Sequence, residues 1–156
     1  MAHMTSTSRH WQVLRSERGA ELVEFAFVLP TLLLLIVGVV DFGLLFQKYE
    51  VVTNAAREGA RVAILPGYNN ADVTARVNQY LTSGGLTGTA TVSVTGPQAI
   101  SVGSQCITVR PVTVSYQHQF LFIGPILTFA GLGSLADKTL NASSAMRDEL
   151  AAGACP

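Results

Sequence analysis

The chain has 156 residues, which is enough for one domain and accessory segments. Hydrophobic residues make up 49% of it and charged residues only 13%, against about a quarter charged in a typical soluble domain. Lipid or other subunits must therefore cover apolar surface. Ten basic and ten acidic side chains cancel, so no net field attracts nucleic acid, and no nucleic-acid partner is expected. Two cysteines without CxxC spacing and three scattered histidines predict neither a metal site nor a cofactor.

Residues 25–46 form an apolar run of 22 residues, FAFVLPTLLLLIVGVVDFGLLF, in which Asp41 is the one charge. As a helix this run spans about 33 Å, which matches the core of a bilayer and predicts a membrane helix. A cleaved secretory signal is the alternative, but no small-x-small site follows the run. Arginines cluster before the run, so the positive-inside rule predicts a cytoplasmic N-terminus and places residues 47–156 outside. The simplest interpretation of Asp41 is that it marks the outer end of the span.

The helical pattern continues beyond the apolar run. Small and apolar residues recur at three- to four-residue spacing over residues 52–63, and Pro66-Gly67 stops the pattern. We therefore expect one helix over about residues 20–65. Its stripe of small residues predicts close packing against a flat surface. Three charged residues lie largely off the stripe and are interpreted as a solvated helix face with weak local pairs: Arg57, Glu58 and Arg61.

A short helix and two strands are predicted downstream. Asn70 can cap a helix over residues 71–81, which Gly84-Gly85 would close. The apolar period then changes to two, which predicts strands over residues 89–95 and 106–120. Together with the long first helix, these elements indicate the α+β class.

The last third of the chain has a weaker pattern. The apolar parity of the second strand switches across Pro111, which suggests a bulge or an edge position. His118, near the end of that strand, is interpreted as an ordinary partly buried histidine. Residues 120–135 are apolar but broken by glycines and a proline, and at about 24 Å are too short to span a bilayer. They predict an apolar loop or short helix that covers the sheet or meets another subunit. Residues 138–147 suit a strand or a helix, and we favour a final strand.

The segment just before the apolar run carries the functional signal. A basic leader ends at Gly19, Glu24 is the fifth residue beyond it, and the aromatic Phe25 is the sixth. A carboxylate in a membrane helix costs about 2.5–3.5 kcal/mol at the bilayer centre, so a functional role is expected for it. Cleavage after Gly19 would create an ammonium group at Ala20. Glu24, on the same chain or on a neighbouring one, is the obvious counter-ion.

Gly19 followed by Glu24-Phe25 resembles the prepilin cleavage junction of type IV-related pilins. The string GAELVEFAFVLPTLLLLIVGVVDFG, followed by NAAREGAR at residues 54–61, is similar to the TadE-like pseudopilins of the tight-adherence (Tad, or Flp) pilus machinery. The resemblance implies a pilin-like α+β fold, with a long N-terminal helix, half membrane and half amphipathic, packed on a small antiparallel β-sheet. It also implies cleavage by a prepilin peptidase between Gly19 and Ala20, and a pilus used for adhesion and surface colonisation.

The implied partners are the prepilin peptidase, other pilin subunits contacted through the N-terminal helices, the inner-membrane pilus assembly machinery and the lipid bilayer. In this interpretation Glu24 and Phe25 serve recognition and assembly. The protein is expected in the inner membrane as a single-pass protein, with incorporation into the extracellular pilus left open. The main alternative is a generic single-pass anchor that displays a periplasmic binding module.

These expectations divide the chain into a cytoplasmic leader (1–19), a transmembrane and assembly helix (20–46) and a periplasmic α+β domain (47–156). Cys106 and Cys155 both fall in the last part, where an oxidising compartment predicts a disulfide between them. No GxSxG, HExxH or phosphate-loop motif occurs in the sequence, so no catalytic residues and no enzyme are expected.

Overall fold

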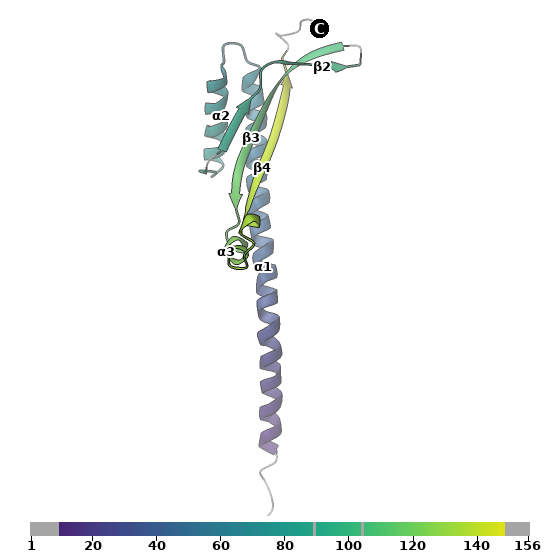
Figure 1. The fold of residues 1–156 in the computed structure, drawn as a ribbon, viewed down its shortest axis with the longest axis vertical. Helices are drawn as coiled ribbons and strands as arrows, with labels where there is room; N and C mark the ends of the chain where they lie inside the picture. Colours follow the sequence, from purple (N-terminus) through teal and green to yellow (C-terminus); the bar gives the residue numbers. More distant parts are fainter. Residues whose placement is uncertain (1–9, 89, 104, 149–156) are drawn as a thin grey trace, which may run out of the picture. The chain divides into compact units, whose positions relative to one another are not determined.

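The computed structural model describes residues 10–88, 90–103 and 105–148. Their elements, in chain order (Figure 1), are α1 (His10–Ala63), α2 (Asn70–Ser83), β1 (Ala90–Val94), β2 (Gln98–Val102), β3 (Gln105–Gln119), α3 (Ile123–Phe129), the 3-10 helix η1 (Gly133–Leu135) and β4 (Asp137–Arg147). A long helix and a small antiparallel sheet confirm the predicted α+β class. The chain separates into two compact units, and the boundary falls within α1, between Val40 and Asp41.

In the first unit, every residue from His10 to Val40 is helical. The helix therefore begins about ten residues before its expected start near Ala20. Nothing in this stretch stops it, because one glycine, Gly19, costs only about 1 kcal/mol in a helix interior. Large apolar side chains are exposed along this part of α1, as Phe27 is at 78%.

One helix in the described part of the chain, Gly19–Ala63, is long and apolar enough to cross a membrane. The most apolar 18-residue window of this helix has a mean hydropathy of 2.5, and none of that window is buried. An isolated helix with this surface is stable in lipid, where its backbone groups are satisfied internally. The helix is therefore compatible with single-pass membrane anchoring.

In the second unit, β3 is the central strand of a four-stranded antiparallel sheet. β1 pairs with its residues 112–116 and β2 with its residues 105–109, while β4 runs along residues 109–119. Because Tyr116 is paired with both Ala90 and Leu140, β1 and β4 lie on opposite edges of β3. β2 was not predicted. All five of its side chains are exposed, so its sequence has no buried face to produce an alternating pattern.

The core of this unit lies between one face of the sheet and the two helices α1 and α2. α1 contributes a stripe of small residues to it, α2 contributes three regularly spaced residues, and the alternate residues of β3 and β4 close it. The fully or nearly fully buried members are Val52, Ala55, Ala56, Ala60, Val62, Ala63, Val73, Val77, Leu81, Leu86, Val112, Val114, Tyr116, Leu140 and Ala142. This confirms both the predicted packing of the small-residue stripe and a final strand over residues 137–147.

The predicted N-cap of α2 needs correction. The N-cap of α2 is Asn69 and not Asn70. The reason is a capping box: the Asn69 side chain accepts from the backbone N–H of Asp72 at 3.1 Å, and the Asp72 carboxylate accepts from the Asn69 N–H at 2.9 Å. A cap at Asn70 would have Val73 in the reciprocal position, and valine cannot accept a hydrogen bond.

Pro111 lies in the central strand, and not in an edge strand. It falls between the segments of β3 that pair with β1 and β2, and its carbonyl accepts from the N–H of Thr95 at 3.0 Å. Along this edge of β3, β1 ends at Val94 and β2 begins only at Gln98. The gap between them lets the central strand accommodate a residue without an N–H. The predicted switch of parity is confirmed, because Val109 is buried before the proline and Val112 after it.

Residues 120–135 form the short helix α3 and the single turn η1. Figure 1 shows them beyond the ends of β3 and β4, next to α1, and not over a face of the sheet. The alternative of a short helix is thus confirmed and the alternative that it covers the sheet is wrong, while a contact with another subunit stays a prediction. The sheet lacks room for it, because α1 and α2 already occupy the apolar face and the other face presents polar side chains such as Thr113 and Ser143.

Candidate functional site

The four residues of the expected cleavage and assembly site all lie on α1 and are exposed: Gly19, Ala20, Glu24 and Phe25. Ala20 and Glu24 are four residues apart, so their side chains lie on the same face of the helix. A Cβ atom built on Gly19 would meet nothing within 4 Å, so the fold itself does not require glycine there. Among the side chains described from residue 19 onward, none pairs with the Glu24 carboxylate. This carboxylate therefore keeps its hydrogen-bonding capacity for a group outside the described chain.

Asp41 has a role that the sequence did not reveal. Its side chain is only 1% exposed, and its carboxylate accepts three backbone N–H groups from the start of α3. The donors are Leu121 at 3.2 Å, Phe122 at 3.0 Å and Ile123 at 2.7 Å. Phe122, the N-cap residue of α3, has no side chain that could cap the helix. Asp41 fills that role from another helix, and its negative charge is stabilised by the positive end of α3.

Aromatic rings pack around the Asp41 clamp, which we define as the Asp41 carboxylate and the N–H groups of residues 121–123. Phe42 meets Phe120 edge-to-face at a centroid distance of 6.0 Å, and His118 meets the same ring at 5.2 Å. Such pairs contribute about 0.5–1.5 kcal/mol beyond their buried area. The start of α3 is therefore held against α1 by packing as well as by hydrogen bonds.

His118 is more deeply buried than expected, at 2% exposure. Neither ring nitrogen has a hydrogen-bond partner among the described residues. Burial lowers the pKa of His118, Lys48 acts in the same direction, and Asp41 opposes both. The ring is consequently neutral near pH 7, which agrees with a packing role.

Glu58 forms an ion-pair cluster with Arg61 and Arg76. Its Oε1 atom is 2.8 Å from Nη2 of Arg61, on the next turn of α1, and 2.9 Å from Nη2 of Arg76, on α2. The hydrogen bond from Arg61 is the main reason why the pKa of Glu58 falls to about 2, with Arg76 adding to it against a desolvation cost. The prediction of a solvated helix face with weak local pairs is therefore incomplete, because Glu58 also joins α1 to α2. No sequence pattern pointed to Arg76, which lies 18 residues away.

The small residues of the segment 54–61 have a structural reason. A Cβ atom on Gly59 would come within 2.6 Å of Cγ2 of Val77 and 3.1 Å of Cγ1 of Val112. The helix backbone thus approaches both α2 and the sheet too closely for a larger residue. At the end of the same helix, Nη1 of Arg110 donates to the carbonyl of Ala63 and satisfies one of the terminal carbonyl groups of α1.

No group of three or more histidine, cysteine, aspartate or glutamate side chains lies together in the described part of the chain in a way that could hold a metal ion. Cys106 is half-buried at the start of β3. Cys155 lies outside the described residues, so its disulfide with Cys106 stays a prediction. The expectation that the protein is not an enzyme also stays a prediction.

No curated protein and no solved structure matches the chain. A family model described as TadE-like protein does match it, over residues 19–61. The matched segment contains the Gly19 junction, the exposed apolar surface of α1, Asp41, and the Glu58 and Arg61 members of the ion-pair cluster. Over this segment the resemblance is confirmed: the chain is similar to TadE-like proteins from Gly19 to Arg61 and has an apolar N-terminal helix.

Proposed function

We propose that the protein is a minor pilin or pseudopilin that takes part in assembly of a Tad pilus. In this proposal α1 anchors it in the inner membrane with a cytoplasmic N-terminus, and residues 47–156 lie in the periplasm. A prepilin peptidase cuts between Gly19 and Ala20, and the mature chain joins other subunits and the assembly machinery through α1. The assembled pilus serves adhesion and surface colonisation.

The observation that carries the proposal is the state of Glu24 in a TadE-like helix. The side chain is exposed where the apolar run begins, and no other described side chain neutralises it. A carboxylate left unpaired in a bundle of apolar helices costs several kcal/mol. The ammonium group that cleavage creates at Ala20 of an adjacent subunit is a partner of the right charge. This pairing would also fix the stagger between neighbouring helices.

The charge pairing is tested with Glu24→Gln as the only copy in the native host. The variant keeps the shape of the side chain and removes its charge. We expect it to be processed and inserted in the membrane, yet to leave the cells without pili. Glu50→Gln is the matched control, because Glu50 is an exposed acid on the same helix outside the apolar run. Normal piliation with Glu24→Gln would refute the pairing.

Cleavage is tested by intact-mass measurement of the protein from its native host, which should find a chain that begins at Ala20. Gly19→Leu should block processing, because the peptidase then meets a bulky side chain at the cut. Gly43→Leu is the control, since added side chains at Gly19 and Gly43 both point into open space. A wild-type protein that retains its arginine-containing leader would favour the generic membrane anchor.

A further inference from the structure

An apolar patch is exposed at α3 and η1, at one end of the second unit. We call it the α3 patch, and its large exposed residues are Leu121, Phe122, Ile126, Phe129, Leu132 and Leu135. Phe129 alone is 95% exposed. Residues 120–136 contain no charged residue. A group of large exposed apolar side chains within one short segment is typical of a contact with another protein or with a membrane.

The Asp41 clamp determines where this patch lies along α1. Asp41 is part of the apolar run 25–46, and at 1.5 Å per residue it lies about 24 Å from the start of that run. The hydrocarbon core of a bilayer is about 30 Å thick. The exposed side chains of Phe42 and Phe46 follow Asp41 on the helix. If the run spans the membrane, Asp41 and the start of α3 therefore lie at the depth of the outer leaflet.

The clamp also removes the main cost of placing these groups in an apolar medium. A bare carboxylate or unsatisfied backbone N–H groups would each oppose transfer into lipid. Here the Asp41 carboxylate is buried and accepts three N–H groups, and the same bonds satisfy the first turn of α3. The same three hydrogen bonds thus satisfy both the carboxylate of Asp41 in the apolar run and the backbone N–H groups at the start of the uncharged, exposed α3.

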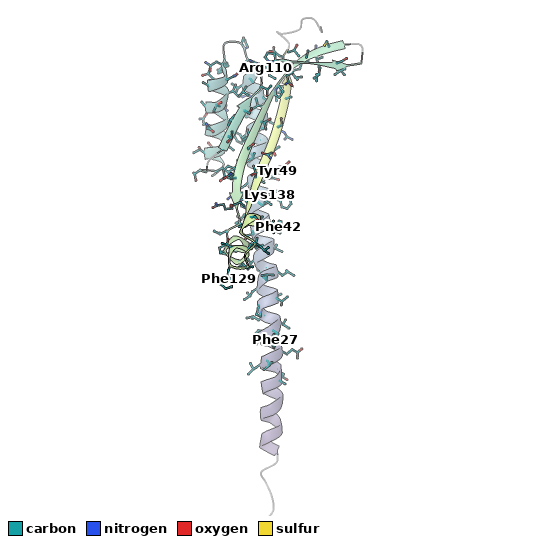
Figure 2. The ribbon with its side chains drawn as sticks, in the orientation of Figure 1. Phe27, Phe42, Tyr49, Arg110, Phe129 and Lys138 are labelled. Atoms are coloured by element: carbon teal, nitrogen blue, oxygen red, sulfur yellow. The ribbon has the colours of Figure 1, made fainter. Side chains whose placement is uncertain are left out.

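Cationic side chains border the patch on the side of the sheet. Lys48 lines a surface hollow together with Phe120 and Leu121, and the exposed Lys138 follows the exposed Asp137 at the start of β4. Figure 2 shows Phe42 and Phe129 at one end of the unit, Lys138 above them, and Arg110 at the opposite end. Lysines at the rim of an apolar membrane contact interact with anionic phospholipid head groups.

We propose that the α3 patch inserts into the outer leaflet of the membrane that α1 crosses, as a second, monotopic lipid contact of the same chain. The proposal rests on the membrane anchoring contained in the proposed function. Lipid is the occupant that matches an uncharged surface joined to the span by the hydrogen bonds of Asp41 and bordered by lysines. The second contact restrains the orientation of the outer domain relative to the bilayer, which a single helix leaves free to rotate.

The test measures tryptophan fluorescence of the full chain in vesicles of phosphatidylethanolamine and phosphatidylglycerol with or without brominated acyl chains. Trp11 is the one tryptophan of the chain and is first replaced by phenylalanine. Into this background one probe is placed at a time. Phe129→Trp reports on the α3 patch, Phe27→Trp on the span, and Tyr68→Trp is an exposed control beyond the end of α1. All three positions are exposed, so the substitutions leave the core intact.

We expect brominated lipid to quench most of the emission of Phe129→Trp and of Phe27→Trp, and to leave Tyr68→Trp unchanged. Quenching of Phe27→Trp without quenching of Phe129→Trp would overturn the inference and leave the anchoring intact. If neither probe is quenched, the anchoring itself fails and the inference fails with it. A blue-shifted but unquenched Phe129→Trp signal that depends on the protein-to-lipid ratio would assign the patch to a second copy, which also overturns the inference.

Discussion

Replacing Asp41 with alanine should release residues 120–136 from α1 while leaving the sheet folded. The substitution removes the acceptor of three part-buried backbone hydrogen bonds. A hydrogen bond to a charged group contributes about 1.5–3 kcal/mol, but these three are coupled and the freed groups can reach water. We therefore expect a loss of about 2–4 kcal/mol, concentrated in this segment. Asp41→Asn should cost less, about 1–2 kcal/mol, because its amide oxygen can still accept two of the three bonds.

Amide hydrogen exchange of the full chain in lipid nanodiscs measures this effect residue by residue. In Asp41→Ala the amides of residues 121–123 should lose protection, while those of Val112 and Val114 in the central strand keep it. Glu50→Ala is the matched control, because it removes an exposed acid from the same helix. Unchanged protection of residues 121–123 in Asp41→Ala would refute the clamp. Uniform loss of protection across the sheet would show that its effect is global.

Three further predictions concern the second unit. Because the folded pKa of Glu58 is about 2 against an ordinary 4.5, the ion-pair cluster stabilises the fold above pH 4.5 and loses that contribution as pH falls toward 2. Because both arginines are largely exposed, we expect the cluster to contribute about 1–2 kcal/mol to the free energy of unfolding. In denaturant unfolding, the stability of Glu58→Gln should therefore depend less on pH than that of the wild-type protein. Gly59→Ala should destabilise the fold by about 1–3 kcal/mol through overpacking against Val77, whereas Gly43→Ala, where the added Cβ meets open space, should not. Equal stabilities of the two variants would contradict the close approach of the α1 backbone to Val77. Thiol labelling of oxidised, unfolded protein should find no free cysteine if Cys106 and Cys155 are joined, a link contributing about 4 kcal/mol in the chain-entropy model.

Local periodicity predicted those elements that bury one face. The spacing of Val73, Val77 and Leu81 indicated α2, and all three are buried in the structure. Leu140 and Ala142 have the two-residue spacing of one strand face, and both are buried in the core. In each case a repeat of 3.6 or two residues is visible without knowledge of the partner surface.

Long-range partners were not predictable in this way. The N–H groups that donate to Asp41 lie 80 to 82 residues away. The residues next to Asp41 in the sequence do not indicate which groups these are. β2 was not predicted because its side chains are all exposed and produce no alternating pattern. Its pairing with β3 follows from the hairpin at Gly103, which has a φ of +65°. An acid inside an apolar run needs a partner, but Asp41 was interpreted only as the outer end of the span. The sequence could show that need but not the group that meets it.

The matched segment 19–61 divides into two parts with different physical roles. From Asp41 onward, the singled-out residues have contacts within the chain. Asp41 is bound by α3 and Glu58 by α2, and the backbone at Gly59 lies close to Val77 and Val112. Between Gly19 and Phe25 the described structure gives them none. Substitutions at Asp41, Glu58 or Gly59 must therefore change folding and function together. Substitutions at Gly19 and Glu24 can change function alone. Loss of cleavage or of pili in a stably folded variant is consequently decisive at the junction, and the same loss at Asp41 or Glu58 requires a measured stability beside it.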